Sequence, residues 1–226
     1  MDNYRPFEYK RGYINFLRCK INLTPKCFIP ERETRVWVKR AINRINSGCK
    51  RRKIKNLNIL DIFAGSGCIG IAILKYIKNS NVTFAEISDD PIKQIKLNLK
   101  LNKINPKRYK VIQSDIFKKL TPRKIGYDYI FANPPYIPLK NRHLIQDSVY
   151  DYEPHLALFG GEDGLLYVRK FLKDAREYLK LGGKIYMEFD CLQKTDLEKL
   201  LRELNYINYK IYKDQFEKYR YVCIKN

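Results

Sequence analysis

The sequence predicts an α/β protein with a mostly parallel, seven-stranded β-sheet and an antiparallel hairpin at one edge. From residue 57 onward, short apolar segments typical of buried strands alternate with segments whose apolar residues recur at helical spacing. This alternation favours a parallel sheet that is covered by helices on both faces. The last two strand segments follow each other without a helix between them, which indicates the hairpin.

Seven strands and five helices are expected. The strands are expected at residues 57–63, 82–87, 109–113, 127–132, 184–189, 206–212 and 219–224. The helices are expected at residues 31–46, 69–77, 91–101, 165–179 and 195–204. Ser47 and Gly48 should end the first helix before a basic loop at 50–53, and Gly182 with Gly183 should end the fourth. The proline-containing segment 133–160 shows few helical signals and is expected to be a long loop.

The chain is expected to divide into an N-terminal arm with short strands, residues 1–30, and one large domain, residues 31–226. Its 226 residues are 45% hydrophobic and 13% aromatic, which argues against a disordered protein. No segment has the pattern of a signal peptide or of a membrane span, so we expect a soluble, cytoplasmic protein. We also expect a monomer.

The formal net charge is +21, from 45 Lys and Arg against 24 Asp and Glu. Such an excess favours association with nucleic acid, a ribonucleoprotein or an acidic protein. Because Lys, Asn, Ile and Tyr are abundant throughout the chain, compositional drift explains the charge equally well. Contact with the ribosome or with RNA through a basic surface therefore stays open. The six cysteines form no Cys-x-x-Cys pair and only two histidines occur, so no metal site is expected.

A glycine-rich turn follows the first strand of the predicted sheet, where residues 61–67 read Asp-Ile-Phe-Ala-Gly-Ser-Gly. Such a turn at the start of a helix lets a ligand approach the backbone and its free N–H groups. Taken alone, the turn is also compatible with a dinucleotide site or with a tight corner that binds nothing.

The next two strands each end in an acid. Glu86 can accept hydrogen bonds from a ribose diol, and Asp115 can accept one from an adenine amino group. Ile116 or Phe117 would then pack on the adenine ring. Each acid alone would be an ordinary surface residue. Together with Asp61, however, they place three acids at the ends of three successive strands, which indicates a nucleoside pocket.

Asn133, Pro134, Pro135 and Tyr136 follow the fourth strand of the sheet. Two prolines cannot continue a central strand, so the chain must turn outward at the mouth of the pocket. An amide or aromatic amino nitrogen is a poor nucleophile because its lone pair is delocalised. Asn133 Oδ1 and the Pro134 carbonyl can each accept one of its N–H groups, which orients the nitrogen toward a methyl donor. Tyr136 offers a face for a planar amide or base. The alternative is a rigid turn without a chemical role.

These motifs resemble those of the class I S-adenosylmethionine methyltransferases, which implies a Rossmann-like sheet and S-adenosyl-L-methionine as the cofactor. The resemblance implies that Asp61 and Gly65 lie near the methionine end of the cofactor, Glu86 at the ribose and Asp115 at the adenine. The implied cofactor-binding residues are Asp61, Phe63, Ala64, Gly65, Ser66, Gly67, Glu86, Ile87, Asp115, Ile116, Phe117 and Asn133. The Asn-Pro-Pro-Tyr motif resembles that of methyltransferases acting on amino nitrogens of glutamine, adenine or cytosine.

Longer strings resemble the release factor glutamine methyltransferases, the HemK/PrmC family. These strings are residues 28–34, 152–165, 187–189 with Gln193, and 213–214 with 220–222. The resemblance implies methylation of the glutamine side-chain amide nitrogen in the Gly-Gly-Gln loop of a translation release factor, which would be the protein partner. The implied catalytic residues are Asn133, Pro134, Pro135 and Tyr136. The implied substrate-binding residues are the same four with Glu33 and Thr34.

The chain departs from that family's pattern in three places. Only about thirty residues precede Pro30, so the family's N-terminal helical bundle is expected to be absent. Glu31 and Arg32 stand where the family usually has Arg-Pro, and Arg35 stands where it has an acid. Residues 60–67 look more like the turn of small ribosomal-RNA guanine methyltransferases. Two alternatives therefore stay open: an RNA or DNA amino-group (adenine or guanine) methyltransferase, and a non-catalytic, ribosome-associated binding module.

Overall fold

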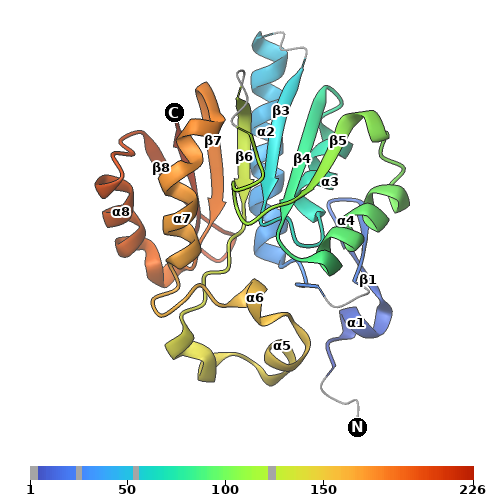
Figure 1. The fold of residues 1–226 in the computed structure, drawn as a ribbon, viewed down its shortest axis with the longest axis vertical. Helices are drawn as coiled ribbons and strands as arrows, with labels where there is room; N and C mark the ends of the chain where they lie inside the picture. Colours follow the sequence, from blue (N-terminus) through green and yellow to red (C-terminus); the bar gives the residue numbers. More distant parts are fainter. Residues whose placement is uncertain (1–4, 24–26, 53–55, 122–125) are drawn as a thin grey trace.

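The computed structural model describes residues 5–23, 27–52, 56–121 and 126–226 (Figure 1). The first elements are α1 (Phe7–Arg11), β1 (Tyr13–Phe16), β2 (Cys19–Asn22), α2 (Arg32–Arg52), β3 (Leu57–Ile62), α3 (Cys68–Tyr76), β4 (Ser80–Glu86), α4 (Asp89–Leu101), η1 (Pro106–Arg108) and β5 (Tyr109–Gln113). The remaining elements are β6 (Tyr127–Ala132), η2 (Leu139–Leu144), α5 (Asp147–Tyr152), α6 (His155–Leu158), α7 (Leu166–Ala175), η3 (Arg176–Tyr178), β7 (Leu179–Glu188), η4 (Cys191–Gln193), α8 (Lys194–Glu203), β8 (Tyr209–Lys213) and β9 (Tyr219–Lys225).

The main sheet has seven strands in the order β5-β4-β3-β6-β7-β9-β8. Strands β3 to β7 pair in parallel, whereas β9 runs antiparallel to both β7 and β8. The predicted mixed sheet with a hairpin at one edge is therefore confirmed. Helices α2, α3 and α4 bury their apolar side chains against one face, and α7 and α8 against the other. This covering explains why the inner strands are continuous apolar runs.

The strands β5 and β6 coincide with the predicted ranges, but the first helix is longer than expected. Ser47 and Gly48 do not end α2, which continues to Arg52. The cost of one glycine inside a helix is about 1 kcal/mol. Beyond Gly48, Cys49 is buried in the same core cluster as Trp37 and Ile45, and this burial favours continuing the helix. The expected basic loop at 50–53 is therefore wrong for residues 50–52, and residue 53 lies outside the described residues.

Gly182 and Gly183 lie inside β7 rather than at the end of a helix. Helix α7 ends at Ala175, and one 3₁₀ turn leads directly into the strand. The pairing of β6 with β7 changes register between Tyr127 and Tyr129, opposite the two glycines. Gly182 has a positive φ of 74° there. The pair thus marks a β-bulge, which is another position where glycine is favoured.

The expected long loop at 133–160 contains helical turns. It holds η2, α5 and α6, each of four to six residues. Helices this short complete too few turns to show a periodic apolar pattern, so no local pattern predicted them.

Strand β2 is attached to α4 by the amide side chains of that helix. Asn98 Oδ1 accepts from the Asn22 N–H at 2.8 Å, and Asn102 Oδ1 accepts from the Lys20 N–H at 3.1 Å. Asn98 also donates to the carbonyl of Ser66 in the glycine turn, at 3.0 Å. One helix therefore holds both the N-terminal strand pair and the turn. Across the residues described, no helix is both long and apolar enough to cross a bilayer.

Candidate active site

A cavity of about 1190 Å³ opens at the carboxyl ends of β3, β4, β5 and β6. Ligands of open α/β sheets bind at this end of the strands. The loops that follow the four strands form one wall. Residues 28–32 and Thr34, together with the α5–α6 region, complete the lining. In Figure 1, α5 and α6 lie below the sheet, at the end of the strands where β6 leads out.

The glycine turn lines the cavity at the end of β3. Phe63, Ala64, Gly65 and Ser66 line the cavity, whereas Gly67, the N-cap residue of α3, does not. Phe63 has a φ of 58°, a conformation that a non-glycine residue adopts only when its surroundings hold it there. Strain of this kind is often found at ligand sites.

Glu86 connects the end of β4 to the glycine turn. Its Oε2 accepts from the Gly65 N–H at 2.8 Å, and its Oε1 accepts from Ile87 and Ser88 at 2.9 and 3.0 Å. The side chain lines the cavity and is 8% exposed. A carboxylate offers about four lone pairs, so one remains for a ligand hydroxyl. Ile87, the next residue, also lines the cavity.

Asp61 lies behind the cavity and does not line it. Its carboxylate is 1% exposed, and Oδ2 accepts from the Gly70 N–H at 2.8 Å. A side chain at position 70 would collide with Phe84 and with this carboxylate, so only glycine fits there. Burial raises the pKa of Asp61 to about 8, although the bond from Gly70 opposes that rise. Asp61 therefore connects β3 to α3 through this hydrogen bond.

After β5, the sequence left open whether Ile116 or Phe117 packs on the adenine ring, and the structure distinguishes the two residues. Asp115 and Ile116 line the cavity, and Ile116 has a φ of 50°, which is strained for a β-branched residue. Asp115 also forms an ion pair with Lys118 at 2.6 Å. Phe117 instead stacks on Tyr178 with ring centroids 4.2 Å apart, in the core. Ile116, and not Phe117, is therefore available to pack on a bound ring.

Asn133, Pro134, Pro135 and Tyr136 line the same cavity, beyond the end of β6. The two prolines are buried, whereas Asn133 and Tyr136 are half-buried. The structure thus brings this loop and the glycine turn to one cavity. Of the two further substrate residues expected, Thr34 lines the cavity and Glu33 does not.

The segment that follows α6 braces this loop. Ile137 donates its N–H to the Leu158 carbonyl at 3.0 Å, and its carbonyl accepts from Gly160 at 2.9 Å. Gln193 donates to the Tyr136 carbonyl at 2.9 Å. A Cβ at Gly164 would lie 2.2 Å from that same carbonyl, so the backbones approach as closely as glycine allows. The part of the string from 158 to 164 therefore fixes the backbone of the loop, while residues 152–154 and 156–158 line the cavity.

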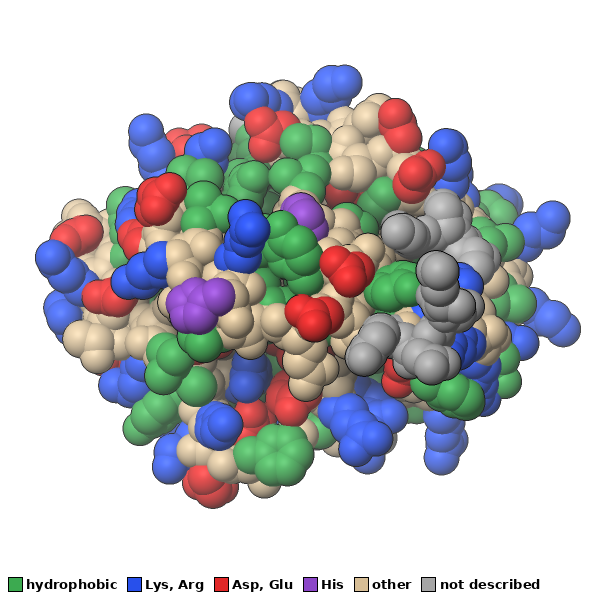
Figure 2. Space-filling view, turned by 90° about the horizontal axis from the view of Figure 1, so that it is seen from below, with side chains coloured by type: hydrophobic (Ala, Val, Ile, Leu, Met, Phe, Trp, Pro, Cys, Tyr) green, Lys and Arg blue, Asp and Glu red, His purple; other side chains and the backbone are tan. Residues whose placement is uncertain are grey.

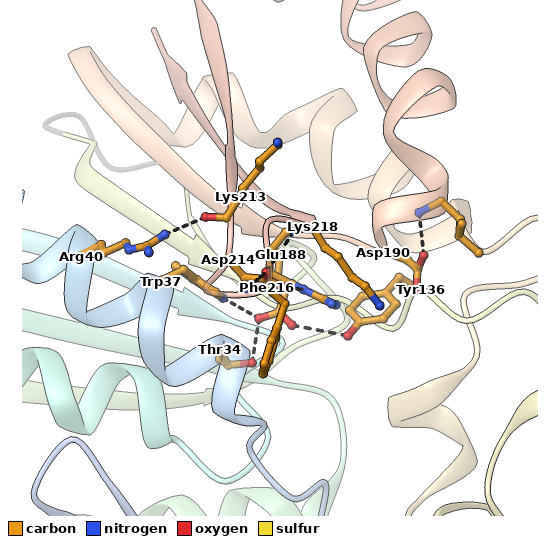
Figure 3. Close-up of polar contacts among 12 residues, drawn as sticks. Thr34, Trp37, Arg40, Tyr136, Glu188, Asp190, Lys213, Asp214, Phe216 and Lys218 are labelled. Carbon is orange, nitrogen blue, oxygen red and sulfur yellow. Dashed lines mark hydrogen bonds and ion pairs between the residues drawn. The ribbon is translucent and has the colours of Figure 1, made fainter.

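Glu188, at the end of β7, connects Tyr136 to α2 (Figure 3). Its Oε2 accepts from Thr34 Oγ1 at 2.7 Å and from Trp37 Nε1 at 2.5 Å. Its Oε1 accepts from the Tyr136 hydroxyl at 3.4 Å. Glu188 is fully buried, and burial together with the charge of Glu31 raises its pKa to about 7. Sequence reasoning did not place Glu188 in the site, because only the fold brings β7 beside the loop.

Arg220 supplies positive charge near this network. Its Nε lies 3.3 Å from Asp214 Oδ2, and the Asp214 side chain is fully buried. Burial lowers the pKa of Arg220. The electrostatic interactions of its guanidinium with Tyr136, Glu188 and Glu31 are larger and raise this pKa above the usual value.

The walls of the cavity are acidic, in contrast to the chain as a whole. Among the described residues, eight acids and two bases line it. The acids are Glu8, Glu31, Glu86, Asp89, Asp90, Asp115, Asp151 and Glu153, and the bases are Arg32 and Lys93. Figure 2 shows the face that carries α5 and α6, where Asp and Glu side chains lie near the middle and Lys and Arg side chains are spread over the rest of the face. No group of three or more His, Cys, Asp or Glu within the described ranges could hold a metal ion.

The strand order and the place of the cavity define the class of protein: this is the fold of the class I methyltransferases. The human hMettl16 catalytic domain, solved in complex with a 3′UTR hairpin, has a TM-score of 0.69. It is 14% identical, and the match covers 98% of this chain and 89% of that one, so the likeness concerns the fold alone. The profile of the methyltransferase small domain matches residues 49–151.

Sequence comparison gives the family. A release factor glutamine methyltransferase of Fusobacterium nucleatum is 34% identical over 93% of this chain, which spans 57% of that relative's length. One of Streptococcus pneumoniae is 32% identical over 98% of this chain, which spans 75% of that relative. The chain belongs to the release factor glutamine methyltransferase family.

Proposed function

We propose that this protein uses S-adenosyl-L-methionine to methylate the side-chain amide nitrogen of a glutamine, that of the Gly-Gly-Gln loop in a translation release factor. The observation that carries the proposal is the position of the Asn133–Tyr136 loop in the wall of the same cavity as the glycine turn. The names of the relatives, which state methylation of a release factor glutamine, support it.

The residues at the strand ends fit the proposed cofactor. The free lone pair of Glu86 can accept from a ribose hydroxyl, and Asp115 with Ile116 offers an acceptor and an apolar surface for a base. The turn at 64–66 presents backbone groups at the start of α3. When bound, this cofactor supplies a methyl group on a positively charged sulfonium, and an acidic cavity favours that charge.

The chain's own residues would bind and orient the amide. Asn133 Oδ1 and the Pro134 carbonyl each accept one amide N–H, which aims the nitrogen lone pair. The same two oxygens stabilise the positive charge that develops on nitrogen. Tyr136 supports the plane of the amide, and Glu188 holds the Tyr136 hydroxyl. No strong base is needed, because the nitrogen proton becomes acidic only after the transfer.

The charge of the cavity favours a peptide over a nucleic acid as the group that enters. A phosphate backbone would meet eight acids and two bases along the walls, which is repulsive. Among the described residues, the positive excess of the chain therefore lies outside the cavity.

The proposal can be tested with radiolabelled S-adenosylmethionine, a purified release factor and total RNA in one reaction. We expect label in the release factor, and none in a release factor whose Gly-Gly-Gln glutamine is replaced. Asn133→Ala should lower the rate at least about 100-fold, the scale of losing one transition-state hydrogen bond. Asn208→Ala, at an exposed asparagine away from the cavity, is the matched control and should leave the rate unchanged. Label in RNA and never in the release factor would overturn the proposal.

A further inference from the structure

The cavity extends beyond the Asn133–Tyr136 loop into a part that the cofactor and the amide do not account for. Four acids line it there: Glu8 of α1, Glu31 before α2, and Asp151 and Glu153 at the end of α5. We call these four residues the acidic recess. Arg32 is the only base among the described cavity residues at this end.

The solvent exposure of the four acids decreases from the rim of the recess to its interior. Glu31 and Asp151 are exposed, Glu8 is half-buried, and Glu153 is buried at 8% exposure. Within the described part of the chain, no ion pair joins any of the four to a lysine or arginine. None of the four is held in an ion pair, although the charge of Arg220 acts on Glu31 from outside the recess. Within the recess the charges of Glu31 and Glu8 oppose ionisation of Glu153.

Glu153 shows that the recess lacks a donor. Its Oε2 is buried and has no hydrogen-bond partner among the described residues. A buried acceptor left unpaired costs about 1–3 kcal/mol, so such groups normally have a partner. Burial, and then the charges of Glu31 and Glu8, raise the pKa of Glu153 to about 8, against a backbone bond from Ile29. An entering cation would supply both the missing donor and the missing charge.

We propose that the acidic recess is a subsite for the arginine or lysine side chain of a residue near the methylated glutamine in the substrate peptide. The subsite rests on the proposed function for its place in the reaction. The exposed acids attract the cation at the mouth, and the buried carboxylate pairs with it inside, where water screens the pair least. Recognition of this kind would discriminate against peptides with an acid at that position.

The first test compares peptides that contain Gly-Gly-Gln and carry arginine at one flanking position in turn. Each has a counterpart with citrulline, which has the shape of arginine without its charge. For at least one position we expect the arginine peptide to have a KM about tenfold lower, the scale of a desolvated charge pair. In the Glu31→Gln/Glu153→Gln variant this preference should disappear. Glu162→Gln, at an exposed acid that does not line the cavity, should keep it.

A second readout separates the subsite from the reaction. Equilibrium binding of the same fluorescent peptides is measured without turnover, after thermal melting has shown that the variant is folded. Tighter binding of an arginine peptide that is lost in the double variant supports the subsite, whether or not the glutamine is methylated. Equal affinities for arginine and citrulline peptides at every position would overturn it. Methylation of both peptides with equal KM would overturn the subsite and leave the proposed function intact.

Discussion

Glu188 is the residue on which the geometry of Tyr136 depends. It receives hydrogen bonds from Thr34 and Trp37 of α2 and from the Tyr136 hydroxyl. The carboxylate is fully buried, so water could not accept hydrogen bonds from these three donors if the carboxylate were removed. The place of Glu86 and Asp115 in the cavity could be predicted from the sequence, because each acid lies at the end of its strand or directly after it. Glu188 could not, because its partners lie more than fifty residues away.

Replacing Glu188 should therefore affect both stability and rate. Glu188→Ala leaves the Thr34 hydroxyl and the Trp37 N–H buried without an acceptor, and we expect a loss of about 2–5 kcal/mol of unfolding free energy. Glu188→Gln keeps an amide oxygen that can accept from Thr34, Trp37 or both, so it should lose less unfolding free energy. Urea denaturation measures the difference, and kcat should fall in the same order while the KM for the cofactor changes little. Equal stability of the alanine and glutamine variants would contradict this account.

At the scale of elements, the string 152–165 both lines the cavity and holds the backbone of the Asn133–Tyr136 loop. The backbone of 137–139 pairs with that of 158–161. The strand boundaries of the sheet followed from local apolar runs, and most were predicted closely. The short helices at 133–160 complete too few turns to show a periodic apolar pattern, and the continuation of α2 through Gly48 depends on packing against the core, so local patterns did not reveal them.

Gly164→Ala tests the brace. Both Gly164 and Gly12 have a positive φ, 78° and 77°, so alanine strains the backbone about equally at either position. Only at position 164 would the new methyl group collide, with the Tyr136 carbonyl and the Gln193 amide; at Gly12 nothing lies within 4 Å. We expect Gly164→Ala to lower kcat at least tenfold and Gly12→Ala to lower only stability. Equal kcat values for the two variants would show that the loop does not depend on this contact.

At the scale of the whole molecule, three buried carboxyl groups couple stability to pH. Burial raises the pKa of Asp61 and Glu153 to about 8 and that of Glu188 to about 7. The folded protein thus keeps these protons up to pH 7 or 8, whereas the unfolded chain releases them near pH 4. Their contribution to stability is complete below about pH 4 and is lost as pH rises through 7 and 8.

The melting temperature should accordingly fall as pH rises from 6 to 9. A change of 1 kcal/mol shifts Tm by about 2–4 °C in a domain of this size, so a fall of several degrees is expected. In the Glu153→Gln/Glu188→Gln variant, which carries neutral groups at every pH, the slope should be shallower. Melting curves at constant ionic strength measure both proteins. Identical slopes would mean that these two carboxyls ionise as freely in the folded protein as in the unfolded chain.

The attachment of β2 to α4 has a consequence for how the chain is built. The bonds from Asn98 and Asn102 reach backbone groups 76 and 82 residues earlier in the sequence. In a chain synthesised from its N-terminus, β2 leaves the ribosome well before the helix that receives it. Contacts this distant form late, because a long loop must close first. Since Asn98 also holds the glycine turn at Ser66, the docking of this early strand and the completion of the ligand site belong to one late folding event.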